Sequence, residues 1–331
     1  MKNRNFRDIP RSLRRRIACF SILIAGCLAF FPDETHAQVP TIYETSFAIT
    51  GSPLDSNASS FYSVNAVTGA PTLIGNIGFS SVSGIDFDSS GTLYGVGQAI
   101  NNGNNVDRTA VLITINPTTG VGTQVAPITF STGGALNQPI QDISFRNSDG
   151  MLFAYSNGDL LTINKTTGVA TLVGNNGLAA PPAGGATAFS PSDKLLTVSQ
   201  TLVLTTNQAT GQLATGPTFA QYAQSNAPGS SYAYATGMDF DNTTGKLWAT
   251  VTIDPTDQLH GVNYLANIDP ITGVVTQVGA LEGDMGFQGL AVAPAVAAVV
   301  PEPGSALVGL LTLGICFCGA FARNRRETVA S

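Results

Sequence analysis

Cysteine is nearly absent from this 331-residue chain, and the few cysteines lie close to its two ends. They are Cys19, Cys27, Cys316 and Cys318. Residues 38–293, which we call the body, contain none. The body therefore has neither a disulfide framework nor a cysteine nucleophile.

Histidine is almost as scarce, because the body contains only His260. A Ser-His-Asp triad would have to be built on this one residue, and no Gly-x-Ser-x-Gly elbow accompanies it. A histidine pair for zinc, a P-loop and a dinucleotide fingerprint are also missing. We expect His260 to be a solvated loop residue, and we predict no metal site, no cofactor and no enzymatic activity.

Charged residues make up 11% of the chain, against about 25% in typical soluble domains. Residues 38–322 hold five basic and 17 acidic residues, a net charge of −12. A segment this acidic argues against nucleic acid and anionic surfaces as direct partners.

A sustained 3.6-residue apolar period is missing as well, and a hairpin unit recurs instead. An alternating strand runs into Asn or Asp, and Thr-Gly follows three residues later. The Asn or Asp side chain can accept from backbone N–H groups two residues on, and the glycine suits a positive φ. An alternative role for these five residues is ligand contact. The five copies are residues 62–69, 113–120, 161–168, 204–211 and 266–273.

A second element alternates with the hairpins and is followed, in the first four copies, by another short strand. Each repeat then supplies four strands in about 45–50 residues, the period of a propeller blade. The five copies are residues 83–88, 141–146, 185–190, 236–241 and 288–292. The sequence predicts an all-β, five-bladed β-propeller; the alternative is a sandwich or an open stack of hairpins.

The two ends of the body each lack part of a blade. The strand 42–47 and its hairpin have no preceding inner strand, while the strand 286–293 has no following hairpin. We predict that Phe287–Val292 pairs with Ile42–Phe47 in one blade, which closes the ring and removes exposed sheet edges.

Acidic and aromatic residues supply the candidate sites. Asp86, Asp142, Asp239 and Asp284 lie near the expected inner strands. They could cleave a glycosidic bond or bind Ca²⁺, but we expect them to cap strand ends and accept from neighbouring backbone N–H groups. Trp248 is expected in the core. The candidate glycan contacts, near a long polar insertion, are Tyr222, Tyr232 and Tyr234.

The N-terminus reads as a secretory signal peptide. Seven basic residues within residues 1–16 precede an apolar stretch, residues 17–31, and Thr35-His36-Ala37 offers small residues for cleavage before Gln38. Two variants stay open: Arg14-Arg15 hints at twin-arginine export, and Cys27 could be acylated after lipoprotein processing.

The C-terminus combines a Pro-Glu-Pro motif, a 17-residue apolar run from Ala306 to Ala322 and a short basic tail. The run reaches the lower limit for a membrane-spanning helix, and the arginines favour a cytoplasmic end. Together these features resemble the PEP-CTERM sorting signal. The resemblance implies cleavage near the motif by an exosortase-type protease, with a permanent anchor as the alternative. The motif and tail residues are Pro301, Glu302, Pro303, Arg323, Arg325 and Arg326.

The sequence thus predicts an exported protein that is transiently anchored in the membrane and then resides at the cell surface or outside the cell. We expect non-catalytic binding, with extracellular polysaccharide as the candidate partner that the resemblance suggests; the alternative is a glycoside-cleaving propeller enzyme. The expected segments are a signal peptide (1–37), the body (38–293), a linker (294–304), a transmembrane helix (305–322) and a cytoplasmic tail (323–331).

Overall fold

The computed structural model describes residues 39–46, 58–101, 105–136, 138–176, 185–199, 201–218, 232–254, 262–281 and 286–295. All of the regular elements in these ranges are β-strands. No helix among them is long and apolar enough to cross a membrane. The predicted signal peptide and the C-terminal segment from residue 296 onward lie outside the described residues.

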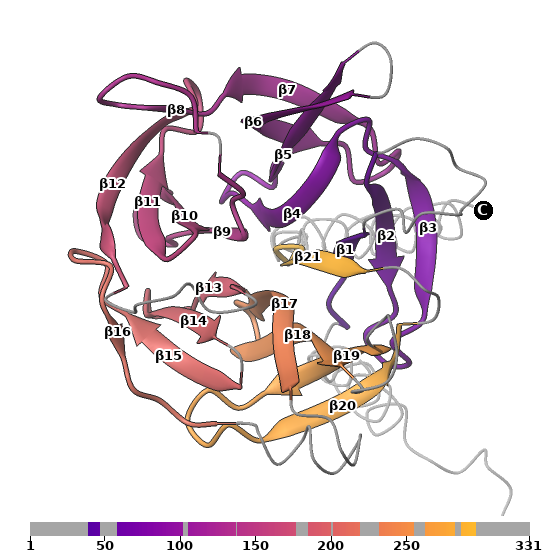
Figure 1. Ribbon diagram of the computed structural model, residues 1–331. Coiled ribbons are helices and arrows are strands. Elements are labelled where there is room, and N and C mark those ends of the chain that lie inside the picture. The colour runs from indigo at the N-terminus through magenta and orange to yellow at the C-terminus, as the bar shows by residue number, and fades with distance from the viewer. Residues whose placement is uncertain are drawn as a thin grey trace, which may run out of the picture.

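The strands form five sheets, which are the blades of a propeller (Figure 1). Blade 1 contains β21 (Phe287–Val292), β1 (Ile42–Ser46), β2 (Ser60–Val64) and β3 (Pro71–Asn76). Blade 2 contains β4 (Ser80–Phe87), β5 (Leu93–Asn101), β6 (Asn105–Ile115) and β7 (Gly122–Pro127). Blade 3 contains β9 (Asp142–Phe145), β10 (Leu152–Ser156), β11 (Asp159–Ile163) and β12 (Val169–Asn175), with β8 (Thr129–Phe130) added parallel to β12 at its outer edge.

The last two blades follow the same plan. Blade 4 contains β13 (Thr187–Phe189), β14 (Leu195–Ser199), β15 (Leu202–Thr206) and β16 (Leu213–Ala214). Blade 5 contains β17 (Tyr232–Asp241), β18 (Lys246–Asp254), β19 (Val262–Ile268) and β20 (Val275–Ala280). Successive inner strands β21, β4, β9, β13 and β17 contact one another around the axis, and β17 returns to β21. The predicted five-bladed propeller is therefore confirmed.

Blade 1 closes the ring by joining the two ends of the body, as predicted. β21 pairs antiparallel with β1, with Ile42 opposite Val292 and Tyr43 opposite Ala291. Beyond the strands, the Ala293 N–H donates to the Thr41 carbonyl at 2.9 Å. The inner strand of this blade thus comes from the end of the chain, and the other three come from its beginning.

The hairpin turns have the predicted chemistry in all five copies. In the first, Asn65 Oδ1 accepts from the N–H groups of Val67 and Thr68, at 2.8 and 3.0 Å. The glycines that close the turns have φ between 70° and 76°, where a side chain would be strained. Turn formation accounts for the recurring Asn or Asp without a ligand.

The same turns also join neighbouring blades at the rim, which the sequence did not predict. Each Thr-Gly pair packs against backbone of an adjacent blade, at or just after its outermost strand. At the closure, a Cβ added at Gly279 would lie 1.9 Å from the Thr68 carbonyl oxygen. The recurrence of Thr-Gly therefore reflects contact between blades as well as turn geometry.

Five apolar clusters fill the spaces between neighbouring blades. Trp248 of blade 5, which is 5% exposed, packs with Tyr62, Phe287 and Leu290 of blade 1. Its predicted place in the core is confirmed. Because the core lies between blades, every blade depends on both neighbours for the burial of its apolar side chains.

Candidate functional site

The five inner strands surround the axis of the propeller, which we call the channel. Acidic residues along it link the inner strands of neighbouring blades. Asp86 Oδ1 accepts from the Phe87 N–H, and Oδ2 accepts from the Phe145 N–H of blade 3 at 2.6 Å. Asp239 repeats the arrangement, since its Oδ2 accepts from the Val292 N–H of blade 1 at 2.8 Å. The predicted bonding of these acids to neighbouring backbone is confirmed.

Two further side chains link the inner strands of blades 3 and 4. Ser144 occupies the equivalent position in blade 3, and its hydroxyl accepts from the Phe189 N–H of blade 4. Asp142 stands two residues earlier in the same blade and accepts from the Thr187 N–H at 2.8 Å. The sequence analysis grouped Asp142 with Asp86 and Asp239, but Asp142 occupies a different position in its blade from the other two.

These acids are buried with no basic side chain among the causes of their pKa shifts, so desolvation has the largest effect on their pKa values. Desolvation raises the pKa of Asp86 to about 7, against the opposing effect of its backbone hydrogen bonds. The pKa values of Asp142 and Asp239 are also raised well above their usual range, first by burial. Nearby acids add to the effect, namely Asp86 and Asp239 at Asp142, and Asp86 and Asp241 at Asp239. The channel therefore favours protonated carboxyl groups.

Glu44 is a fourth buried acid, which the sequence analysis missed. It is fully buried on β1, and its Oε1 accepts from the Thr250 hydroxyl of blade 5 at 2.8 Å. Burial raises its pKa to about 8. The signal was available, because Glu44 shares a face with the buried Ile42 in a strand of period two.

At one end of the channel lies a pocket of about 330 Å³, which we call the glutamine mouth. All five blades contribute at or near the start of their inner strands, with Ser81, Gln141, Gly185, Tyr234 and Gln288 among the lining residues. Gln98 and Gln138 add two further amides, and no described lining residue is charged. The pocket therefore combines a largely apolar wall with uncharged amide and hydroxyl groups, and it lies where the blades converge.

Local backbone irregularities shape this mouth. Ser81 has a φ of 49°, an uncommon conformation for a residue with a side chain. The pairing register also shifts within β4 between Ser80 and Gly84, and within β17 between Ala235 and Gly237. Such bulges re-aim side chains and are frequent next to functional sites.

The opposite end of the channel holds a pocket of about 270 Å³, which we call the carboxylate mouth. Asp86, Asp88, Arg146, Asp239 and Asp241 line it. Asp88 makes an ion pair of 2.8 Å with Lys165 of blade 3. Burial acts to raise the pKa of Asp88, but this contact and hydrogen bonds from Ser90 and Thr92 outweigh it and lower the pKa.

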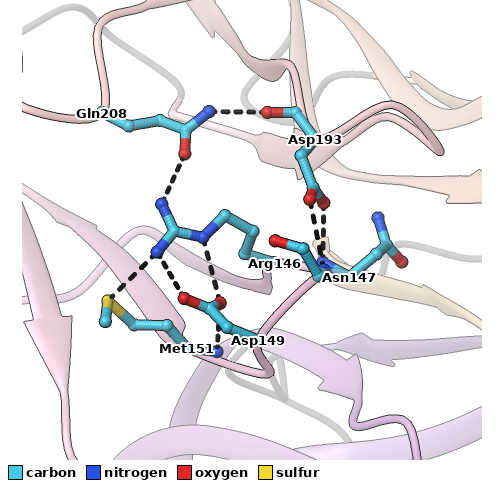
Figure 2. Close-up of polar contacts among 7 residues, drawn as sticks. Arg146, Asn147, Asp149, Met151, Asp193 and Gln208 are labelled. Carbon is cyan, nitrogen blue, oxygen red and sulfur yellow. Dashed lines mark hydrogen bonds and ion pairs between the residues drawn. The ribbon is translucent and has the colours of Figure 1, made fainter.

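Figure 2 shows how charges beside the carboxylate mouth are engaged with one another. Arg146 contacts Asp149 at 2.6 Å and donates to the Gln208 amide oxygen of blade 4 at 2.8 Å. Asp193 of blade 4 accepts from the backbone N–H of Asn147. These contacts hold blades 3 and 4 together, and we assign them a structural role.

Of the three predicted glycan contacts, the structure places one at a pocket. Tyr234 lines the glutamine mouth, half-buried. Tyr232 begins β17, where the structure describes its backbone only, and Tyr222 lies outside the described residues. The glutamines were missed, although Gln141 and Gln288 occupy the same position in the repeat.

Several predicted sites lie outside the described residues. They are His260, Asp284, the cleavage site at Ala37 and Gln38, the motif Pro301, Glu302 and Pro303, and the tail residues Arg323, Arg325 and Arg326. Within the described ranges, no group of three or more His, Cys, Asp or Glu side chains is placed to hold a metal ion.

No protein-family model matches the chain, and no curated protein matches it. Similar solved structures include a nidogen/laminin complex, with 8% identity, a TM-score of 0.44 and coverage of 76% of this chain and 98% of that one. TolB from Acinetobacter baumannii has 11% identity, a TM-score of 0.45 and coverage of 87% and 74%. A 6-phosphogluconolactonase-like protein from Bacteroides uniformis has 14% identity, a TM-score of 0.39 and coverage of 74% and 84%. Similarity at this level carries no argument about function.

Proposed function

We propose that this chain is an exported, non-catalytic binding protein whose ligand site is the glutamine mouth. The observation that carries the proposal is a division of roles along the channel. The carboxyl oxygens of Asp86, Asp142 and Asp239 accept backbone N–H groups, whereas the opposite end presents a neutral, hydrogen-bonding pocket. The acids serve the fold, and the neutral pocket is left for a ligand.

The bonding of the acids bears on the alternative of a glycoside-cleaving enzyme. Such an enzyme needs one carboxyl group to protonate the leaving oxygen and another to act as base or nucleophile. Asp86 and Asp239 line a pocket and have raised pKa values, a property shared with catalytic acids. Each of them, however, already accepts two backbone N–H groups, one of them from a neighbouring blade, and these bonds account for both carboxyl groups without a reaction.

The proposed location and partner rest on the sequence. A signal peptide at residues 1–37 and a tail that resembles PEP-CTERM support export, transient anchoring and processing by an exosortase-type protease. Because that resemblance associates such tails with bacteria that make exopolysaccharide, extracellular polysaccharide is the proposed ligand.

A glycan-binding screen on residues 38–299 tests the proposal, with analysis of reaction products in the same samples. This fragment contains every described strand. We expect binding of at least one polysaccharide without shortening of its chain. Replacement of Tyr234 by Ala should weaken the binding because aromatic stacking area is lost, and Tyr222→Ala and Tyr232→Ala extend the test to the other two predicted contacts. Chain shortening that disappears in Asp86→Asn or Asp239→Asn would instead establish the enzyme.

A further inference from the structure

We infer that the glutamine mouth recognises one or two neutral sugar units and discriminates against acidic sugars. This inference rests on the proposed function and adds the chemical class of the ligand. Four glutamines line this pocket: Gln98 and Gln288 lie on strands of blades 2 and 1, and Gln138 and Gln141 lie in the connection into blade 3.

The lining groups match the hydrogen-bonding chemistry of sugar hydroxyls. Each glutamine amide offers two donors and an acceptor, and a sugar hydroxyl can donate and accept. Ser81 adds a hydroxyl, and Tyr234 adds an aromatic ring that can cover an apolar sugar face. Neutral amides suit neutral polyols, because neither partner has a charge to desolvate.

The charge distribution disfavours an acidic sugar. None of the described lining residues is basic. The body as a whole is strongly acidic, with only five basic residues between positions 38 and 322. A uronate carboxylate in this pocket would be desolvated without a cationic partner.

The size and rigidity of the pocket favour a short ligand segment. Its volume of about 330 Å³ is near the lower end of the range of about 300–1,000 Å³ for small-molecule sites. Gln141 Oε1 accepts from the Asn157 N–H at 2.8 Å, and the Ser83 hydroxyl donates to the Ile140 carbonyl. Gly237 packs tightly against the Gln288 backbone. These contacts hold the Gln141 side chain and the Gln288 backbone in place before a ligand arrives, which lowers the entropy cost of binding.

The experiment is isothermal titration calorimetry at physiological ionic strength. The neutral probes are hexasaccharides of glucose and mannose with different linkages, and the acidic probes are oligomers of mannuronate and galacturonate. The variants are Gln288→Ala and Gln98→Ala, which come from different blades. Gln124→Ala, on the exposed outer strand β7, is the matched control. Trp248 fluorescence verifies that each variant is folded.

We expect a neutral probe to bind and the acidic probes not to bind. Loss of one amide should weaken the affinity about three- to tenfold, while the control leaves it unchanged. Neutral binding that is unaffected in both pocket variants would overturn the glutamine mouth as the site, but not non-catalytic glycan binding by the protein. Acidic probes binding as tightly as neutral ones would overturn the ligand class. Binding of no glycan in either series would overturn the proposed function itself.

Discussion

Glu44→Gln should stabilise the protein at mildly alkaline pH and leave it unchanged in acid. Glu44 is fully buried, and Oε1 accepts from the Thr250 hydroxyl, while Oε2 has no hydrogen-bond partner among the described residues. A glutamine amide oxygen can accept the same hydrogen bond, and the side chain is neutral at every pH. The substitution therefore imitates the protonated carboxyl group.

The size of the effect follows from the pKa. Burial raises the pKa of Glu44 from 4.5 to about 8. A raised pKa in the folded state means that the stabilisation is complete below pH 4.5 and is lost as the pH rises through about 8. At about 1.4 kcal/mol per pKa unit, the loss reaches about 4 kcal/mol at the upper end of this window. The free energy of unfolding of the variant should exceed that of the wild type by up to this amount there.

Urea unfolding at about pH 5 and about pH 8, followed by fluorescence, measures the difference. Trp248 is the only tryptophan and is buried at the interface of blades 1 and 5, so it reports on the relevant structure. Asp86, Asp142 and Asp239 also have raised pKa values but remain in both proteins, so the comparison isolates Glu44.

Asp269→Asn is the control for loss of a negative charge. Hydrogen bonds from Ile271 and Thr272 lower the pKa of the exposed Asp269. The stabilisation that its ionised form provides is therefore lost only in acid, below the pH range of the experiment. Asn makes the same turn in the other four copies, so any change in stability should be small and equal at both pH values. Equal stability of Glu44→Gln and the wild type at about pH 8 would refute the reasoning.

Three further predictions test the ring, the channel and the tail. Gly279→Ala should lower the free energy of unfolding by about 1–3 kcal/mol, because its Cβ would lie 1.9 Å from the Thr68 carbonyl oxygen; an unchanged urea midpoint would show that the rim contact does not matter. Asp239→Asn should lower the free energy of unfolding by about 1–3 kcal/mol at about pH 5, because it leaves one of two backbone N–H groups without an acceptor. Glycan binding should be preserved. Loss of binding with unchanged unfolding would make Asp239 a ligand contact. Fractionation of cells with an antibody to the body should reveal a species cut near Pro301–Pro303, whereas only full-length protein in the membrane would reject processing.

The repeat made the propeller predictable from the sequence. Alternation of period two, the Asn or Asp of each turn and the positive φ of the closing glycine are local properties, and these residues carry them in every copy. Counting strands at the two ends was then enough to predict the pairing of β21 with β1. Burial of Trp248 followed from its place in a strand pattern.

The site was decided by tertiary structure, because its residues converge only when the ring closes. Gln98 and Gln288 are far apart in the chain, and nothing local to either marks a shared pocket. Likewise, the raised pKa of Glu44 arises from burial between blades 1 and 5, a relation set by closure rather than by neighbours in sequence. The sequence determined the strands and turns through local backbone chemistry. The ring alone determined which carboxyl groups are buried as links between blades and which glutamines line the glutamine mouth.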